Sequence, residues 1–214
     1  MPNTPLLKAL ERGALVQMDT RRYVYTSFTT SSTTVVTRQD LWLEEHLTDV
    51  PVNSVYSGVV SLQNLCIRVF LAELSNLQVH AADVGNAYLE AETKEKVYVI
   101  GGPGFGELEG HTLIIHKALY GLRSSGLRWH EKFAATLRDM GFVPSKEDID
   151  IWMQRNGNIW EYFATYVNNL AIIMKDPKLF TDLLIDKYKY KLKGVGPITY
   201  HLGNDYKRDP DGTF

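Results

Sequence analysis

Residues 162–174 read Tyr-Phe-Ala-Thr-Tyr-Val-Asn-Asn-Leu-Ala-Ile-Ile-Met. Two apolar runs, rich in the aromatic and β-branched residues that favour strands, flank the two asparagines. Asparagine tolerates the left-handed backbone conformation better than other non-glycine residues, so Asn168 and Asn169 between such runs predict a tight turn. We therefore expect a β-hairpin with Asn168 and Asn169 at its tip.

The composition of the chain is that of a globular protein. It has 214 residues, of which 44% are hydrophobic and 22% charged, and is long enough for one or two domains with a core. Its formal net charge is −2, whereas affinity for nucleic acid comes largely from Lys and Arg side chains that neutralise phosphates. Any nucleic-acid surface is therefore expected to be local.

Cysteine content and hydropathy bear on the cellular compartment and on membrane association. Cys66 is the only cysteine, which excludes an internal disulfide and fits a reducing compartment. Its apolar neighbours at helical spacing predict that Cys66 lies in the core. No uninterrupted apolar run approaches the roughly 18 residues of a membrane span, and we expect neither export nor a membrane anchor.

Hydrophobic periodicity predicts helices and strands from residue 47 onward, whereas residues 1–46 carry a poor pattern. A helix is expected over Leu62–Leu77, followed by a strand over Gln78–Val84 that presents Asp83 near its end. The next expected elements are strands at 97–100 and 113–115, and then a helix with the apolar stripe Trp129, Phe133, Leu137 and Met140, closed by Gly141.

Antiparallel hairpins dominate the second half of the chain. Asn156-Gly157 is a strong turn signal between two strand-like runs. Asp176 and Pro177 predict the N-cap and first residue of a helix that runs to about Leu192. A strand is expected over 198–208, and the mixture as a whole predicts an α+β fold.

Lysines alternate with tyrosines and a leucine over residues 187–193. Cations at the C-terminal end of a helix are favoured by the helix dipole, which explains the pattern without a ligand. Cations interleaved with aromatic rings also suit contact with a nucleic-acid strand. The sequence leaves both interpretations open.

Four motifs, in this order along the chain, resemble those of one family. Asp83–Leu89 resembles the first catalytic motif of reverse transcriptases. Lys117–Arg123, with Trp129 after it, resembles a segment specific to copia-type elements. Tyr166–Asn169 resembles the catalytic Tyr-x-Asp-Asp hairpin, and Tyr200–Gly203 resembles the primer-grip strand.

Residues 47–214 therefore resemble the reverse transcriptase domain of a copia-type LTR retrotransposon, and residues 1–46 are a divergent N-terminal segment. The resemblance implies the fingers and palm of a right-hand polymerase, with an antiparallel palm sheet backed by helices and without a thumb. It implies RNA-directed DNA polymerase activity with two Mg²⁺ ions, an RNA or DNA template-primer and deoxynucleoside triphosphates. The missing thumb and ribonuclease H regions would belong to a parent polyprotein in a cytoplasmic replication particle.

The resemblance also assigns roles to individual positions. Asp83, Asn168 and Asn169 match the three catalytic positions, of which Asp83 would be a metal ligand. The remaining matched positions are the hairpin residues Tyr166 and Val167, the nucleotide-binding residues Asn86, Ala87, Tyr88, Tyr120 and Gly121, and the primer-grip residues Tyr200, His201, Leu202 and Gly203. Arg123, Arg128, Lys191 and Lys193 are candidates for contact with nucleic acid, one of the two lysines lying near the leaving pyrophosphate.

Two departures from the family pattern bear on activity. Asn168 and Asn169 stand where the family has carboxylates, and neutral amides cannot supply the charge that holds two divalent cations. Asparagine preserves the shape and turn propensity of aspartate, so we expect the fold to survive while catalysis is lost. In addition, the basic fingers strand expected near Thr37–Glu45 carries one cation and three acids here.

Three functions therefore remain in competition: an active polymerase domain, a non-catalytic relic that binds template-primer, and a protein-interaction domain. The net charge favours the last of these over the first, whereas the local cations leave room for the second. The histidines lack metal-ligand spacing and Ser124-Ser125 lacks the surroundings of a nucleophilic serine, so no other class of enzyme is indicated.

Overall fold

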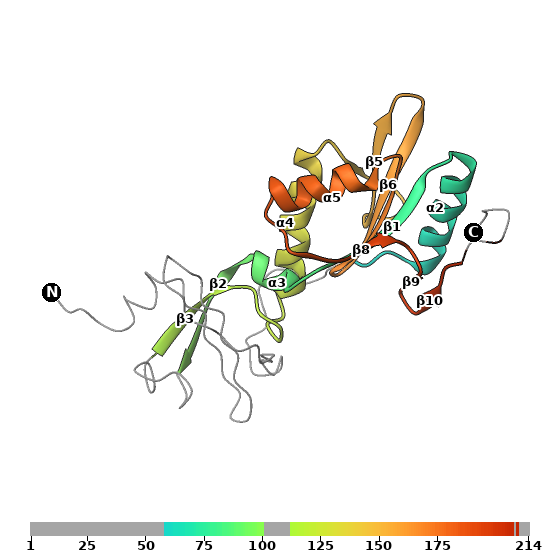
Figure 1. The fold of residues 1–214 in the computed structure, drawn as a ribbon. Helices are drawn as coiled ribbons and strands as arrows, with labels where there is room; N and C mark the ends of the chain where they lie inside the picture. The colour runs from blue at the N-terminus through green and yellow to red at the C-terminus, as the bar shows by residue number, and fades with distance from the viewer. Residues whose placement is uncertain (1–57, 101–111, 208, 210–214) are drawn as a thin grey trace. The chain divides into compact units, whose positions relative to one another are not determined.

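A computed structural model describes residues 58–100, 112–207 and 209 (Figure 1). Our expectations for residues 1–46, and for the acidic fingers segment among them, lie outside the described residues. The described chain divides into two compact units, one of residues 88–100 and 112–129 and one of residues 58–87, 130–207 and 209. We call these the hairpin unit and the sheet unit.

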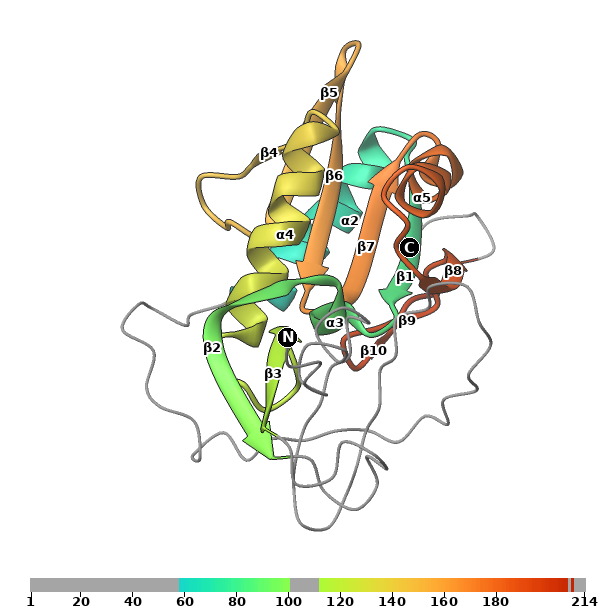
Figure 2. The ribbon, with the colours of Figure 1, turned by 90° about the vertical axis from the view of Figure 1, so that its left-hand side faces the viewer.

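The sheet unit is built on a six-stranded sheet in which every neighbouring pair is antiparallel. The order of its strands is β4 (Val143–Pro144), β5 (Ile151–Asn156), β6 (Ile159–Tyr166), β7 (Asn169–Met174), β1 (Gln78–Val84) and β8 (Leu192–Pro197). Strand β1 comes from early in the chain and lies between two late strands (Figure 2). This long-range pairing brings Asp83 beside the hairpin of β6 and β7.

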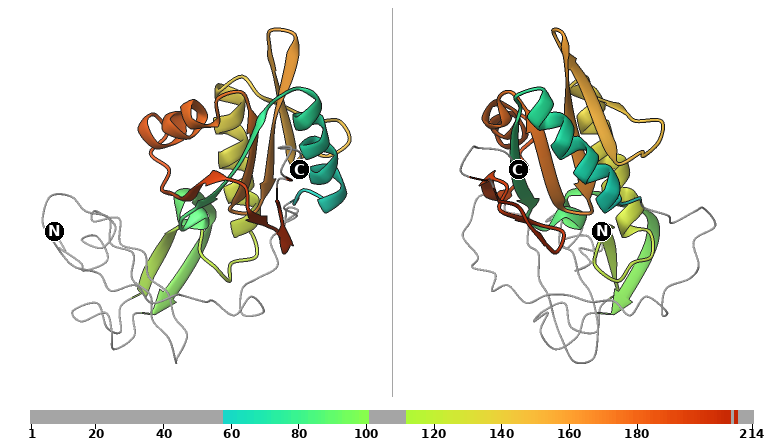
Figure 3. Two further views of the ribbon diagram at one scale, coloured as in Figure 1. Left: turned by 45° about the vertical axis from the view of Figure 1, so that its right-hand side comes forward. Right: turned by 90° about the vertical axis from the view of Figure 1, so that its right-hand side faces the viewer.

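Helices cover both faces of this sheet. Helix α2 (Leu62–Leu74) lies on one face, and helix α5 (Pro177–Asp186) and the later part of α4 (Ser125–Asp139) lie on the other (Figures 2 and 3). Successive residues of β6 serve the two faces, because side chains alternate along a strand. The ring of Phe163 packs at a tilt against Phe133 of α4 and Phe180 of α5, whereas Ala164 packs in a cluster with Leu65 of α2.

The hairpin unit contains a two-stranded antiparallel sheet of β2 (Glu92–Ile100) and β3 (Thr112–Lys117), in which Val97 pairs with Ile115. These strands include both short strands expected from the sequence. The short helix α3 (Ala87–Glu90) precedes β2, and the amide of Ala118 donates to the carbonyl of Ala91 over 3.0 Å.

The predicted helix caps and turns that depend on neighbouring residues were confirmed. The side chain of Asp176 accepts a hydrogen bond from the amide of Leu179 over 3.0 Å, and Pro177 opens α5. Gly141 follows α4 with a φ of 89°, and Gly157 turns the β5–β6 hairpin with a φ of 62°. The α+β class with an antiparallel sheet is likewise confirmed.

Three sequence expectations about element boundaries were wrong. The loop of the central hairpin consists of Val167 and Asn168, because Tyr166 pairs with Asn169, which is already part of β7. Helix α5 ends at Asp186 rather than near Leu192, since Leu192 begins a strand that pairs with the edge of β1. The strand expected over 198–208 was also wrong, because residues 200–205 form a short hairpin.

That hairpin consists of β9 (Tyr200–His201) and β10 (Asn204–Asp205). Leu202 and Gly203, with φ of 50° and 82°, form a two-residue loop, the geometry of a type I′ turn. The expected core position of Cys66 was also wrong, because Cys66 is exposed. The apolar residues of α2 occupy more than one face, and only Leu65, Val69 and Ala72 are buried.

We expect Phe163→Ala to lower the free energy of unfolding by about 3–5 kcal/mol, because Phe163 is fully buried between α4, α5 and the sheet. Trp160→Ala on the same strand is the matched control, since Trp160 is 43% exposed. Urea denaturation of the three proteins measures the difference. Equal losses for both variants would show that Phe163 is not at the centre of this core.

Candidate functional site

The loop of the β6–β7 hairpin holds a backbone conformation that its sequence disfavours. Val167, the first loop residue, has a φ of 55°, which is rare for a β-branched side chain. A positive φ at the first of two loop residues and not at the second is the pattern of a type II′ turn. Such strain, of order 1–3 kcal/mol, persists only where the surroundings hold it. The flanking strands, each paired on both sides, supply that restraint.

Strand β1 places Asp83 directly against this loop. Asp83 is the antiparallel partner of Asn169, and the amide of Val84 donates to the carbonyl of Asn168 over 2.8 Å. The side-chain amide of Asn168 donates a short hydrogen bond to Oδ2 of Asp83. The amide of Asn169 in turn donates to Oδ1 of Asn168 over 3.4 Å. The structure thus brings the three catalytic positions of the sequence analysis into one chain of hydrogen bonds.

Strand β8 adds a cation to the same place. Lys193 is opposite Asp83 in the pairing of β1 with β8, and the amide of Gly85 donates to the carbonyl of Lys191 over 2.8 Å. A Cβ on Gly85 would lie 3.1 Å from Cε of Lys193 and 3.3 Å from that carbonyl. Gly85 therefore leaves room for the Lys193 side chain to pass across the end of β1.

The oxygen donors gathered here do not fit a pair of Mg²⁺ ions. Hard divalent cations require charged oxygen ligands, and Asp83 supplies the only carboxylate of the three positions. The amide that faces it presents its NH₂ group, which cannot bind a metal. Among the described residues, no group of three His, Cys, Asp or Glu side chains is placed to hold a metal ion.

Asp150, a buried carboxylate that no sequence pattern indicated, contacts strand β6 of the β6–β7 hairpin. Asp150 is 1% exposed, and its Oδ1 lies 2.9 Å from Nε2 of His130 and accepts from the Thr165 hydroxyl over 3.3 Å. Its carbonyl accepts from the amide of Thr165 over 3.0 Å. A Cβ on Gly58 would lie 2.0 Å from the other carboxylate oxygen. No local pattern links these residues, since they come from separate elements.

The expected nucleotide-binding residues divide between the two units. In the hairpin unit the rings of Tyr88 and Tyr120 lie 4.5 Å apart, and burial raises the pKa of the Tyr88 phenol. Gly121 has a φ of 93°. Of the two arginines proposed to contact nucleic acid, Arg128 is buried and Arg123 is half-buried. In the sheet unit, Asn86 has a φ of 58° and Ala87 is fully buried.

The expected primer-grip residues form the β9–β10 hairpin. Tyr200 is 63% exposed, whereas His201 is buried and Leu202 packs against the cluster that contains Leu65. Burial lowers the pKa of His201, and its Nε2 atom has no hydrogen-bond partner among the residues that the structure describes. The β9–β10 hairpin therefore exposes the ring of Tyr200 to solvent and buries the side chain of His201.

Comparison with known sequences identifies the family of the chain. The profile of the family described as "Reverse transcriptase (RNA-dependent DNA polymerase)" matches residues 33–213, so the chain belongs to that family. The matched relatives include the Retrovirus-related Pol polyproteins from transposon RE1 of Arabidopsis thaliana, 28% identical over 73% of this chain, and from transposon TNT 1-94 of Nicotiana tabacum, 26% identical over 75%. The copia-type resemblance read from the four motifs is confirmed.

A further relative is the Transposon Ty1-NL2 Gag-Pol polyprotein of Saccharomyces cerevisiae, 26% identical over 67% of this chain. The aligned regions cover 11%, 12% and 8% of the three relatives, so this chain spans about a tenth of their length. No solved structure matches the chain. Among the described residues, no helix has the length and hydropathy that crossing a membrane requires.

We expect Asn168→Asp to lower the free energy of unfolding by about 1–3 kcal/mol in metal-free buffer. The substitution replaces a hydrogen-bond donor with a second carboxylate against Asp83, so an attraction becomes a repulsion. Asn204→Asp is the control, because the Asn204 amide donates to a backbone carbonyl and not to a carboxylate. An equal loss for the two variants in chemical denaturation would contradict the Asp83 contact.

We expect His201→Phe to weaken the dependence of stability on pH. Burial lowers the pKa of His201 below its usual value of about 6.5, so the unfolded chain binds a proton more readily than the folded chain. The stability contributed by neutral His201 is therefore present above about pH 6.5 and is lost as the pH falls through the folded pKa. Denaturation at pH 8 and pH 5.5 should show a smaller difference for the variant; an unchanged difference would exclude His201 as a contributor.

Proposed function

We propose that residues 47–214 are the fingers and palm of a copia-type RNA-directed DNA polymerase, and that this chain binds template-primer without extending it. The sheet unit would be the palm, and β2 and β3 would belong to the fingers. Residues 1–46 would be a divergent segment, and the thumb and ribonuclease H regions would lie elsewhere in a parent polyprotein. The setting would be a cytoplasmic replication particle.

The hydrogen bond between Asn168 and Asp83 is the observation that carries this proposal. The register of β1 with β7 and the strained loop at Val167 hold three side chains where a polymerase of this family would need three carboxylates. Asn168 and Asn169 keep the positions of the missing carboxylates beside Asp83, and this arrangement supports descent of the chain from an active polymerase. Because neutral amides do not neutralise two divalent cations, the same geometry supports loss of catalysis.

The remaining roles are proposed from position. Tyr88 would lie under the sugar of the incoming nucleotide, with Asn86 and Ala87 near its triphosphate and Tyr120 and Gly121 near the base pair. Lys193 is better placed than Lys191 to meet the pyrophosphate, since its side chain lies over Gly85 at the end of β1. The exposed ring of Tyr200 would contact the primer.

A protein-interaction domain is the second candidate, and the formal net charge of −2 favours it. Binding to a labelled RNA–DNA hybrid distinguishes the two candidates. A template-primer relic should lose affinity steeply between low and physiological salt, because counterion release dominates such binding. An interaction domain should show no measurable affinity at either salt concentration.

We expect the unaltered chain to show no Mg²⁺-dependent primer extension, and the double variant Asn168→Asp, Asn169→Asp to show at least weak extension. The reason is that the double variant restores both missing carboxylates on an intact scaffold. The matched control is the triple variant that adds Asp83→Asn, which should be folded and inactive. Extension by the unaltered chain would refute the proposal of inactivity.

A thermal-unfolding series in Mg²⁺ supplies a readout that does not depend on activity. The melting temperature of the double variant should rise with added Mg²⁺, because a ligand that binds the folded state stabilises it. The unaltered chain and the triple variant should not respond. Stabilisation without extension would show that the metal site is restored and that another part of the polymerase is missing.

A further inference from the structure

A cavity of about 300 Å³ opens in the sheet unit, away from the Asp83 hairpin. It lies between α5, the segment that follows α4, the adjoining ends of β5, β6 and β7, and the segment after α5. Its volume is at the lower end of the range of ligand pockets, roughly 300–1,000 Å³. The residues that line it are Met140, Phe142, Gln154, Asn156, Glu161, Met174, Lys175, Asp176, Leu179, Phe180, Leu183, Lys187 and Tyr188.

The inner wall of this cavity is apolar. Phe142, Met174 and Phe180 are exposed by only 2%, 3% and 5%, and the rings of Phe142 and Phe180 meet edge to face with centroids 5.6 Å apart. Leu179 and Leu183 of α5 are largely exposed and continue the apolar surface outward. The wall therefore suits a hydrocarbon body, such as one aromatic ring.

Glu161 places a buried carboxylate in the same wall. Its side chain belongs to a residue that is 8% exposed. Oε1 accepts from the side-chain amide of Asn156 over 3.2 Å and from the backbone amide of Lys175 over 2.9 Å. These two bonds orient the carboxylate but bring no counter-charge, and none of the ion pairs among the described residues includes Glu161.

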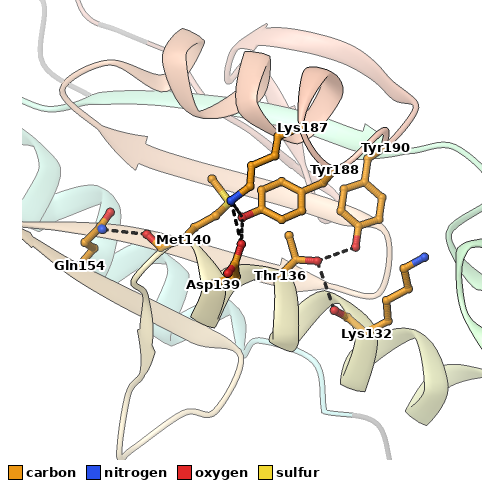
Figure 4. A network of polar contacts seen from close by, with 8 residues as sticks. All are labelled: Lys132, Thr136, Asp139, Met140, Gln154, Lys187, Tyr188 and Tyr190. Atoms are coloured by element: carbon orange, nitrogen blue, oxygen red, sulfur yellow. Dashed lines mark hydrogen bonds and ion pairs between the residues drawn. The ribbon is translucent and has the colours of Figure 1, made fainter.

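The other charged side chains that line the cavity are exposed to solvent or paired with an opposite charge. Asp176 is exposed and caps α5, and Lys175 is exposed. The ammonium of Lys187 donates to Asp139 over 2.8 Å and to the Tyr188 hydroxyl over 2.9 Å, as Figure 4 shows. That carboxylate holds the pKa of Lys187 above its usual range. Glu161 is therefore the buried charge of the cavity, and a carboxylate removed from water is stabilised by a cation that hydrogen-bonds to it.

We propose that this cavity binds a small organic cation, with an apolar body against Phe142 and Phe180 and one ammonium or amidinium group on Glu161. The inference does not rest on the polymerase activity of the chain, because the lining includes none of Asp83, Asn168 or Asn169. An anionic ligand would meet the buried carboxylate and is disfavoured. A neutral ligand would lack the charged hydrogen bond and bind less tightly.

The test is a nuclear magnetic resonance titration of the full chain with three aromatic probes: phenethylammonium, the neutral 2-phenylethanol and the anion benzoate. We expect phenethylammonium to shift the backbone amide signals of Gln154, Lys175 and Leu183 saturably and to bind more tightly than the other two probes. Glu161→Gln should weaken its binding about tenfold, the value of one charge-assisted hydrogen bond, and leave binding of the alcohol unchanged. Asp182→Asn is the matched control, since Asp182 pairs with Lys178 outside the cavity and should not alter binding.

A second variant keeps the proposal testable if Glu161→Gln does not fold. Leu183 lines the cavity from a position on α5 that is 41% exposed, so Leu183→Trp can fill the cavity without disturbing the core. It should abolish binding of both the ammonium and the alcohol. Equal affinity for all three probes, signal shifts confined to other regions, or unchanged affinity in both cavity variants would overturn the proposal.

Discussion

The pairing of β1 with β7 is the constraint on which the rest of the structure depends. It joins residues about ninety positions apart, with Gln78 opposite Met174 and Asp83 opposite Asn169. A slip of one residue would move every side chain of β1 to the opposite face of the sheet. Such a slip in either direction would remove Val79 from its cluster with Val69 and Leu77 and would separate Asp83 from Asn169 of the β6–β7 hairpin. The buried clusters on the α2 face, and the Phe133, Phe163 and Phe180 rings on the other face, therefore hold the register that positions the candidate site.

The same pairing explains how the two amides are accommodated. Three clustered carboxylates without metal repel one another, whereas here one carboxylate accepts from an amide that is itself an acceptor for the next amide. Strand β8 also pairs Lys193 with Asp83 and places the Lys193 side chain over Gly85. The three side chains thus hydrogen-bond to one another without a ligand, which supports the proposal that this fold persists without catalysis.

A second set of contacts ties the segment after α5 to α4. The Tyr190 hydroxyl lies 2.8 Å from that of Thr136, Asp139 accepts from Lys187 and Tyr188, and Lys132 lies over the Tyr190 ring (Figure 4). Lys189, with a φ of 63°, turns the chain within this segment. The lysines of residues 187–193 therefore differ in their contacts. Lys187 binds Asp139 of α4, whereas the side chain of Lys193 lies over Gly85 at the end of β1.

Much of the fold follows from short-range chemistry and was predictable from the sequence. Asp176 before Pro177, Gly141 after an amphipathic run and Asn156-Gly157 between apolar runs each determine a cap or a turn within a few residues. The four ordered motifs likewise determined the family, because residue identities carry that information directly.

Tertiary structure decided the features that depend on distant partners. Val167 takes the positive φ although Asn168 and Asn169 tolerate it better, because the pairing of Tyr166 with Asn169 sets the loop. The helix expected to run to about Leu192 ends at Asp186, and Leu192 instead begins β8, because the unpaired backbone groups at the edge of β1 are satisfied by strand pairing. The cavity at Glu161 and the contacts of Asp150 could not be predicted from the sequence for the same reason. Each joins segments that are distant in the chain and meet only in the folded sheet unit.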